Sequence, residues 1–440
     1  MNFFLKRVIL AAVVLMTANA AWCDDFLASG ASARTVATGG AWMPSSTGAL
    51  DAMAINPAGL TLLNAPTIDM SLESAFARGQ FVNSANPNGL LNSNGVIPYG
   101  AFGTPLGSSP FSLGLAVLPE LMSAANWHYT DTPGGVGGVS YGPLNNKSDI
   151  LAMRATAGLG WSVSRKLKIG VALGAVYNRN TLETAYVFQT NPALAGLKTL
   201  LDLHTSGVGW NGSAGALFQA SKQLQIGVAY HSRTTVQSTG LATGNAGIQF
   251  AQIGLGAARP DFQYNAEVDN TLPQSVTANV VWQATSRLRL VGQGDWINWS
   301  DAFTNLPVIL TNGNNADING LLQTNGIKDS IPLDWRNQIV GRFGVERSWQ
   351  ENMTIRAGYA YANSPVPSST LTPLTGAITR NTLSAGFGYQ HGRYRFDAAY
   401  SVDPTMQQSV QQSTIKSGEY SNSKVSVGVQ SLVLTTSVRL

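Results

Sequence analysis

Charged side chains are scarce in this 440-residue chain, in which Asp, Glu, Lys and Arg together make up 11% of the residues. Soluble domains usually contain about 25%. Cysteine is nearly absent, since Cys23 stands alone, and this excludes a disulfide framework and a thiolate metal site. After residue 23, no apolar run approaches the roughly 18 residues that a membrane-spanning helix needs. These shortages exclude membrane helices and argue against a soluble enzyme.

Catalytic and cofactor motifs are also missing from the sequence. The four histidines are scattered, and there is no histidine pair at metal-binding spacing, no Walker loop and no Gly-x-Ser-x-Gly elbow. No run of Lys and Arg suggests a nucleic-acid partner. We therefore expect neither an enzyme nor a nucleic-acid-binding protein, and we expect no cofactor and no metal.

Residues 1–23 have the features of a secretory signal peptide. Lys6 and Arg7 precede the apolar run 8–16, and small residues follow it. The run is too short to span a bilayer, so it predicts a leader that is cleaved after Ala20 or Cys23.

Glycine and a period-2 pattern are what the chain has instead. Glycine occurs 46 times, and segments such as "LKIGVALGAVY" (167–177) and "LQIGVAY" (224–230) place an apolar residue at every second position. This period predicts strands with one apolar and one polar face. We count fourteen such segments. Because a bilayer accepts only helices or closed barrels, residues 66–440 predict an all-β fold, a 14-stranded antiparallel transmembrane β-barrel.

The connections between the predicted strands alternate in length. The strands start near residues 66, 96, 110, 149, 166, 207, 223, 271, 287, 335, 352, 380, 392 and 424. Long connections rich in Asn, Ser, Thr, Gly and Pro are expected at about 77–95, 120–148, 181–206, 241–270, 301–334, 364–379 and 403–423. Short turns at one end and long loops at the other are typical of outer-membrane barrels, as are aromatic girdles. The girdles are predicted from Tyr177, Tyr230, Trp296, Tyr359, Tyr361 and Tyr400 at one level and Trp161, Trp282, Trp349 and Tyr389 at the other.

Residues 24–65 do not alternate and are dominated by small side chains. A fourteen-stranded barrel leaves an open lumen unless something fills it, so we interpret this segment as an N-terminal plug, or hatch, inside the lumen. Near its end, "INPAGLTLL" predicts a helix start, because Asn56 can cap a helix and Pro57 suits the first helical position.

Three blocks resemble one family. The stretch "ASGASARTVATGGAWMPSSTGALDAMAINPAGLTLL" resembles the plug of the FadL-type long-chain fatty acid transporters of Gram-negative outer membranes, with Asn56, Pro57 and Ala58 matching the family's Asn-Pro-Ala motif. "LPQSVTANVVWQATSRLRLVGQGDWINWSDAF" and "GRFGVERSWQENMTIRAGYAYANSPVP" resemble later blocks of that family. The order of these blocks makes the resemblance specific, and it extends from about residue 26 to the C-terminus.

The resemblance implies passive transport across the outer membrane. The expected cargo is long-chain fatty acids or other hydrophobic small molecules, captured at the extracellular loops, held in an apolar internal site and released sideways through a gap in the barrel wall. Two alternatives stay open: an uptake channel for aromatic hydrocarbons of the toluene and xylene type, and a structural barrel at the cell surface that transports nothing. We also expect a monomer that lies among outer-membrane lipid and lipopolysaccharide.

The third predicted strand, "FSLGLAVLPELM", carries a proline. Pro119 cannot donate a ladder hydrogen bond. One hypothesis is that Leu118, Pro119 and Leu121 border the lateral opening. The alternative is that Pro119 ends the strand where a long loop begins.

Apolar residues within the predicted outer loops are candidates for the capture surface, because an apolar patch among polar loops usually marks a binding site. They are Met122 and Trp127, together with Leu197 and Leu200, which belong to a leucine cluster at near-helical spacing over 194–203. Lumen-facing cations could meet a ligand carboxylate, and Arg154 lies highest among them. Most lumen charges are expected to pair with each other or with the hatch.

Overall fold

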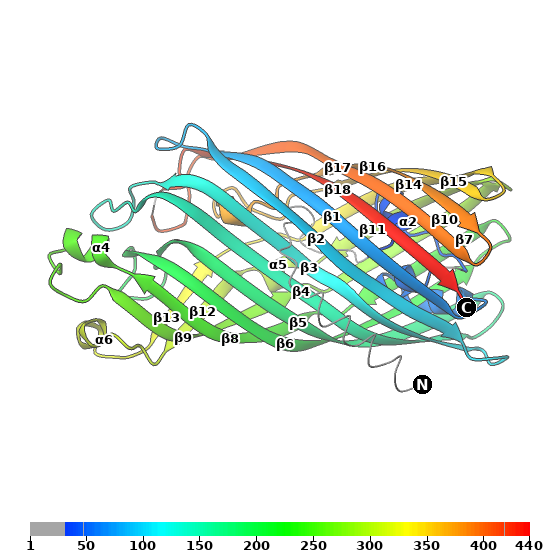
Figure 1. Ribbon diagram of the computed structural model, residues 1–440, viewed down its shortest axis with the longest axis horizontal. Coiled ribbons are helices and arrows are strands. Elements are labelled where there is room, and N and C mark those ends of the chain that lie inside the picture. Colours follow the sequence, from blue (N-terminus) through cyan, green and yellow to red (C-terminus); the bar gives the residue numbers. More distant parts are fainter. Residues whose placement is uncertain (1–30, 47, 418) are drawn as a thin grey trace.

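The computed structural model describes residues 31–46, 48–417 and 419–440. The chain forms a closed β-barrel whose strands are strongly tilted against the long axis (Figure 1). The predicted signal peptide, residues 1–23, lies outside the described residues. Among those residues, none of the helices combines the length and the hydropathy that a membrane-crossing helix requires.

The strand segments of the described chain cover most of it. They are β1 (Thr67–Val82), β2 (Gly89–Pro105), β3 (Phe111–Asp131), β4 (Gly142–Ser162), β5 (Leu167–Val187), β6 (Lys198–Gln219), β7 (Leu224–His231), β8 (Thr234–Asn245), β9 (Asp261–Leu272), β10 (Ser275–Thr285), β11 (Leu288–Ile297), β12 (Asn305–Thr311), β13 (Ile327–Pro332), β14 (Gln338–Gln350), β15 (Met353–Ala362), β16 (Asn381–His391), β17 (Tyr394–Val410) and β18 (Ser423–Arg439). The helical segments are α2 (Ala33–Val36), α3 (Ala49–Ala54), η1 (Pro57–Leu62), α4 (Gly247–Gln252), α5 (Trp299–Ala302), α6 (Ala316–Leu322) and η2 (Pro373–Thr375).

The eighteen described segments make fourteen barrel strands, as the alternation predicts. Four strands are interrupted once, because β7 and β8, β9 and β10, β11 and β12, and β13 and β14 each continue one another along the wall. All pairings are antiparallel, and β1 pairs with β18 to close the barrel. The six short turns all lie at one end, here called the turn end, and the long connections lie at the other, here called the loop end (Figure 1).

The expected loop boundaries are wrong in one consistent way, because the strands run further toward the loop end than the apolar alternation does. β3 reaches Asp131 and β5 reaches Val187, although loops are expected from 120 and 181. The expected loop 301–334 contains β12, α6 and β13. The physical reason is that backbone pairing continues above the membrane, where the outward side chains can be polar and the apolar period therefore fades.

The outer face of the barrel carries the predicted aromatic girdles. At the loop-end level the exposed rings are Tyr177, Tyr230, Tyr359, Tyr361 and Tyr400, and at the turn-end level they are Trp161, Trp282 and Trp349. Amphipathic rings favour the two membrane–water interfaces. These two levels therefore mark the part of the wall that faces lipid.

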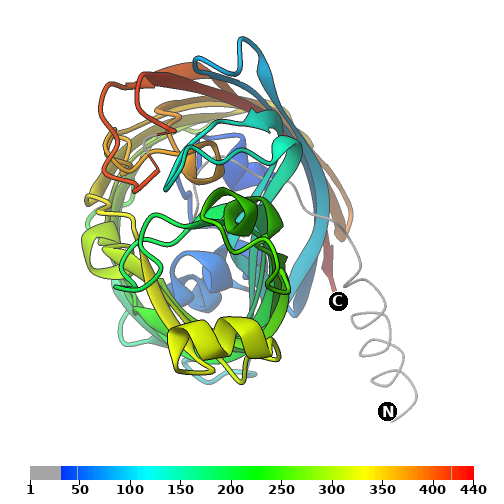
Figure 2. The same ribbon diagram turned by 90° about the vertical axis from the view of Figure 1, so that its left-hand side faces the viewer.

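Residues 31–46 and 48–65 lie inside the barrel, toward the turn end, and β1 begins at Thr67 (Figure 2). Residues 24–30 of the predicted hatch lie outside the described residues. α2 contacts β16, β17 and β18, whereas α3 and η1 contact β1 to β6. The segment is almost entirely buried, with Leu50, Met53 and Leu60 at 0% exposure. It therefore occupies the lumen at this end and packs against the wall.

Candidate functional site

The Asn-Pro-Ala motif ties the interior segment to the wall. Asn56 caps η1, since its side-chain oxygen accepts a hydrogen bond from the Ala58 amide at 3.0 Å, and Pro57 is the first residue of η1. The side-chain nitrogen of Asn56 donates to the carbonyls of Ala216 and Val228, at 3.2 and 3.0 Å. Those two residues face each other on β6 and β7. One amide thus caps a helix and fastens it to two strands.

Glycine in the wall makes this contact possible. A Cβ atom at Gly215 would overlap the Asn56 side chain, and one at Gly170 would overlap the backbone of Pro57 and Ala58. Both wall strands therefore carry glycine at those positions because the hatch backbone approaches them closely.

Lumen charges are paired, as expected from the sequence. Glu346 is the centre of a buried cluster in which three arginines, one of them from the hatch, surround one carboxylate. The described contacts are Arg34–Glu346 at 3.2 Å, Arg289–Glu346 at 3.0 Å, Arg356–Glu346 at 2.7 Å, Arg356–Asp397 at 2.9 Å, Arg395–Asp397 at 2.7 Å and Arg342–Asp295 at 2.7 Å. Through Arg34, this cluster joins the hatch to the wall.

The wall is interrupted between β2 and β3. The two strands pair at Leu91–Trp127 and again from Gly100–Val117, but residues 92–99 have no β-partner on β3 among the described residues. Over the same stretch β2 stays paired with β1, and β3 stays paired with β4. We call this interruption the β2–β3 gap.

Each border of the β2–β3 gap carries a proline. Pro119 lies within β3, which continues to Asp131, so the alternative that Pro119 ends its strand is wrong. Pro98 lies on the facing stretch of β2. Neither residue has an N–H to donate across the gap. The sequence prediction of an opening rests on Pro119 alone, although Pro98 lies within the second predicted strand and is the same kind of signal.

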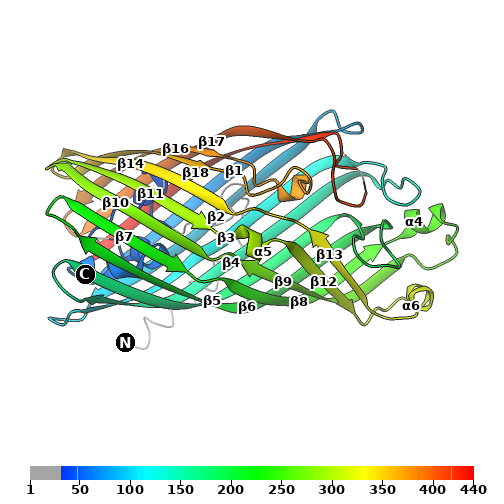
Figure 3. The same cartoon turned by 180° about the vertical axis from the view of Figure 1, so that it is seen from behind.

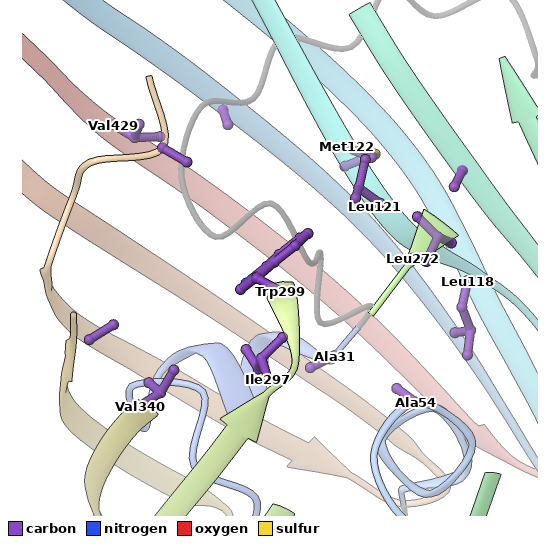
Figure 4. Packing of buried hydrophobic residues seen from close by; sticks show 14 of the residues in the cluster. Ala31, Ala54, Leu118, Leu121, Met122, Leu272, Ile297, Trp299, Val340 and Val429 are labelled. Carbon is purple, nitrogen blue, oxygen red and sulfur yellow. The ribbon is translucent and has the colours of Figure 1, made fainter. Parts of the chain in front are cut away.

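Leu118, Leu121 and Met122 lie on the gap-facing stretch of β3 (Figure 4). All three are buried, at 0%, 0% and 2% exposure, in a cluster that also includes Ala31 and Ala54 of the hatch. Leu118, Pro119 and Leu121 therefore lie along the β3 border of the β2–β3 gap. Their role at a lateral opening stays a prediction.

Arg154 is not a free cation, which corrects its assignment as a carboxylate receptor. Its Nε lies 2.9 Å from Oε2 of Glu120, and its Nη1 donates to Oδ1 of Asn211 at 3.3 Å. The Arg154 side chain is 3% exposed. Its charge is therefore already neutralised within the protein.

The other predicted capture residues lie apart from one another. Trp127 is fully buried at the loop-end border of the gap. The leucine cluster is not helical, because Leu200, Leu201 and Leu203 belong to β6 and Leu197 precedes it in a turn. Closely spaced leucines occur in helices and in strands alike, so their spacing alone does not distinguish the two. Here the pairing of β6 with β5 and β8 makes this segment a strand.

A cavity of about 170 Å³ lies in the loop-end half of the lumen. Its lining is mostly apolar and includes Ile150, Leu182, Tyr186, Leu203, Val268, Phe303, Leu306, Val308, Ile331, Leu333, Trp335, Leu374 and Tyr420. Polar positions are held by Asn, Thr, Ser and Gln, and Glu419 is the one carboxylate among the described lining residues. No Lys or Arg lines it within the part of the chain that the structure describes. None of the predicted capture residues belongs to this lining.

An aromatic triad forms one side of the cavity. Trp299, Phe303 and Trp335 have ring centroids 4.9–5.1 Å apart. Phe303 and Trp335 line the cavity. These residues stand where the wall strands are interrupted, between β11 and β12 at α5 and between β13 and β14 (Figure 3). The interruptions let the chain turn inward and bring large rings into the lumen.

Two polar clusters hold the loop-end rim of the cavity. Lys198, fully buried, contacts Asp131 at 2.5 Å and Glu419 at 2.6 Å. Burial raises the pKa of Glu419, and the charge of Lys198 opposes that rise. The rim is therefore cross-linked from β3 and β6 to the connection between β17 and β18.

The second rim cluster centres on the carboxylate of Asp329. It accepts hydrogen bonds from the Tyr186 hydroxyl at 2.6 Å and from the amides of Gln189, Thr190 and Asn191. Burial alone would raise the pKa of Asp329, but the hydrogen bonds from Tyr186, Gln189 and Thr190 outweigh it and hold the pKa below its usual range. This carboxylate fixes the connection 188–197 over the cavity.

The geometry defines a closed transmembrane β-barrel with a filled turn end, an apolar cavity near the loop end and an interrupted wall. The chain belongs to the outer membrane protein transport protein family (OMPP1/FadL/TodX), whose sequence pattern matches residues 9–440. Its place is the outer membrane of a Gram-negative bacterium, and the matching family is one of transport proteins.

Similar proteins agree with this assignment. Outer membrane protein P1 of Haemophilus influenzae is 22% identical over 246 residues, which is 50% of this chain and 48% of that protein. The match thus spans about half the length of that relative. Crystal structures of a Pseudomonas aeruginosa FadL homologue (17% identity, 94% of this chain and 99% of that one, TM-score 0.74) and of the Pseudomonas putida toluene transporter TodX (19%, 95% and 100%, 0.74) share the fold. So does the Ralstonia pickettii toluene transporter TbuX (20%, 92% and 97%, 0.71).

Proposed function

We propose that this protein is a passive outer-membrane channel for uncharged hydrophobic molecules, which enter the apolar cavity from the loop end and leave sideways through the β2–β3 gap. The observation that carries the proposal is the lining of the cavity, which is apolar and has no described cation. Ligand pockets of this kind hold the body of a ligand by burial, worth about 0.8 kcal/mol for each CH₂ removed from water.

The chemistry of the cavity favours neutral cargo over carboxylates. A carboxylate needs a cation or several donors when it leaves water, and the one charged group described in the lining is the acid Glu419. An engineered apolar cavity of about 150 Å³ binds benzene, and the cavity here is about 170 Å³. A small aromatic hydrocarbon therefore fits better than the anion of a long-chain fatty acid, the cargo that the sequence resemblance implies.

Lateral release gives hydrophobic cargo a path that avoids water. The gap stretches of β2 and β3 lie beside the apolar cluster of Leu118, Leu121 and Met122. An opening in the wall would deliver cargo into the membrane rather than into the periplasm, where each exposed methylene is unfavourable. Monomeric behaviour and contact with lipopolysaccharide remain expectations of this proposal.

The capture step is tested by placing amides in the cavity. Leu306→Gln with Ile331→Gln should reduce binding and uptake of toluene, because both side chains line the cavity. Leu321→Gln is the matched control, since Leu321 is 54% exposed on α6. Growth of a deletion strain that carries each variant, on toluene and separately on oleate, reads out the cargo. Growth on oleate alone would refute the preference for neutral cargo, and growth unaffected on both substrates would favour a structural barrel.

The exit step is tested by restoring backbone donors at the gap. Pro98→Val with Pro119→Val gives both strands the N–H groups that a continuous ladder needs, and uptake should be lost. Pro273→Val is the control, because Pro273 stands at the interruption between β9 and β10, away from the gap. Unchanged uptake in the gap variant would rule out this exit.

A further inference from the structure

The β2–β3 gap requires something that holds it open. Residues 92–99 leave a stretch of β2 without a strand partner on β3, and only local substitutes such as the hydrogen bond from the Asn126 amide to the Ser93 hydroxyl, at 3.0 Å, are described there. Backbone groups within a barrel wall gain by completing the ladder, because lipid offers them no other partner. A wall that stays interrupted must therefore be held apart by other contacts.

A bulge on β3 lies at the turn-end part of the gap. Pro119 pairs with Met153 of β4 and Leu121 pairs with Ala152, so Glu120 is the extra residue between them. A bulge of this kind bends its strand and re-aims a side chain. The carboxylate of Glu120 is the side chain that the bulge re-aims, and it is only 14% exposed.

Glu120, Arg154 and Asn211 form a closed polar triangle, which we call the gap triangle. Glu120 lies 2.9 Å from Arg154, Arg154 donates to Asn211 at 3.3 Å, and Asn211 donates back to Glu120 at 3.2 Å. The three residues come from β3, β4 and β6. The triangle therefore draws the bulge of β3 toward the strands on the side away from β2.

The gap triangle also lies beside the anchor of the hatch. Asn211 stands two residues before Ser213 on β6, and Ser213 pairs with His231 of β7. The Nε2 atom of His231 is 3.1 Å from the carbonyl oxygen of Ile55. Ile55 immediately precedes the Asn56 cap. The hatch motif and the gap triangle are thus linked through β6 and the adjoining end of β7.

We propose that Glu120, Arg154 and Asn211 are positioning residues for lateral release, which hold β3 away from β2 by fastening the β3 bulge to β4 and β6. The inference rests on the proposed exit through the gap but concerns a different property, the separation of the two strands. Glu120 and Arg154 are both buried, so they hold the bulge of β3 firmly only while both charges are present. Removing one of them leaves a lone buried charge, which is strongly destabilising.

The test follows the separation of β2 and β3 from the turn-end edge of the gap, where Val117 is the last paired residue of β3. Spin labels at Val96→Cys and Val117→Cys, in a Cys23→Ser background, stand on outward positions of β2 and β3 that are 41% and 42% exposed. Glu120→Gln and Asn211→Leu should shorten the distance between these labels, and uptake should fall with it. Labels at Leu72→Cys and Leu434→Cys, on directly paired β1 and β18, should show no change.

Two further variants separate an effect on the position of β3 from an effect on the folding of the barrel. Glu120→Leu with Arg154→Leu removes both charges, so that no lone buried charge is left, and it should shorten the gap distance as Glu120→Gln does. Asp295→Asn breaks a buried ion pair of the same kind, with Arg342 at 2.7 Å, on β11 and β14. It should leave the gap distance unchanged. Barrel assembly of each variant is checked by its heat-dependent mobility.

The outcomes distinguish this inference from the exit proposal. A gap distance that is the same in the wild-type protein, Glu120→Gln, Asn211→Leu and the double leucine variant overturns the inference, even if Pro98→Val with Pro119→Val abolishes uptake. A shorter distance with unchanged uptake supports the positioning role and instead refutes the exit. A shortening in Asp295→Asn as large as in Glu120→Gln would also overturn the inference, because any lost ion pair would then have the same effect.

Discussion

At the turn end of the lumen, Arg34, Arg289 and Arg356 converge on Glu346, and the hatch packs against the wall. At the loop end the described lining of the cavity is mostly apolar, with Glu419 as its one charged residue, and Lys198 and Asp329 lie at the rim. The same barrel wall thus carries paired charges where it holds the hatch, and it carries apolar surface at the cavity, where cargo would travel. Charges in this lumen join segments of the protein to one another, whereas the apolar surface would bind cargo by burying it.

The largest effect is expected from breaking the charge cluster. Glu346→Gln leaves three arginines around a neutral side chain, and the loss of one partner of a buried ion pair costs about 3–5 kcal/mol. The free energy of unfolding in detergent should fall by that amount, and protease should cleave within the hatch. An unchanged free energy of unfolding would show that the cluster does not fasten the hatch. Arg233→Gln is the control, because its partner Asp301 and Arg233 itself are about half exposed.

A smaller effect is expected where a neutral amide does the fastening. Asn56→Ala leaves the carbonyls of Ala216 and Val228 without this donor, which costs about 1–3 kcal/mol. The barrel should still assemble and keep its heat-dependent mobility, while hydrogen exchange in η1 becomes faster and uptake falls. Asn352→Ala, in an exposed turn, is the control. Loss of assembly in Asn56→Ala would mean that the motif is needed for folding and would refute a role in gating.

At the loop end, the expected effect is on binding rather than on folding. Trp335→Leu removes one ring of the aromatic triad from the cavity, and aromatic contacts are worth about 0.5–1.5 kcal/mol beyond their buried area. The affinity for toluene, measured by tryptophan fluorescence or calorimetry, should fall several-fold with little change in unfolding. Trp349→Leu, at a ring that is 64% exposed, serves as the control. Equal losses in both variants would argue that the triad is not part of the binding site.

The smallest effect concerns pH at the rim. The pKa of Asp329 lies below its usual range in the folded protein, so its contribution to stability is complete above the unfolded value of about 4 and is lost as pH falls through the folded value. Hydrogen exchange in 188–197 should therefore stay slow at pH 5 and rise only in stronger acid. Asp329→Asn should show fast exchange at both pH values. Exchange that already rises at pH 5 in the native protein would contradict the lowered pKa.

Much of the barrel follows from the sequence because its outward face must be apolar wherever it meets lipid. Tyr177 and Tyr230, at the ends of alternating segments, mark the membrane boundary in the sequence itself. Above that boundary the constraint disappears, which is why β12 and β13, within "NLPVILT" and "IKDSIP", are not separated from loops by the pattern. The cavity residues Leu306 and Ile331 lie in those two strands, and the site could not be assigned without them.

The β2–β3 gap shows a second limit of the sequence. Pro119 is a local signal, because proline cannot donate to any ladder. Pro98, the extra residue Glu120 and its partner Asn211 lie on three different strands, and only the register of those strands brings them together. Likewise, Arg154 is by its residue type a candidate to bind a ligand carboxylate, but in the structure it forms an internal ion pair with Glu120. Pairing register is decided by the whole wall and cannot be inferred from one segment.

The four interrupted strands have a consequence for how such barrels can change. On the turn-end side of the interruptions, β7, β10, β11 and β14 pair in sequence, and on the loop-end side β8, β9, β12 and β13 form their own ladder. A register shift or an insertion in the loop-end ladder therefore need not change the register of the turn-end ladder. We therefore expect that this loop-end ladder, which carries Leu306 and Ile331, can be replaced by the corresponding segment of a relative with other cargo. The lipid-facing wall should keep its register in such an exchange.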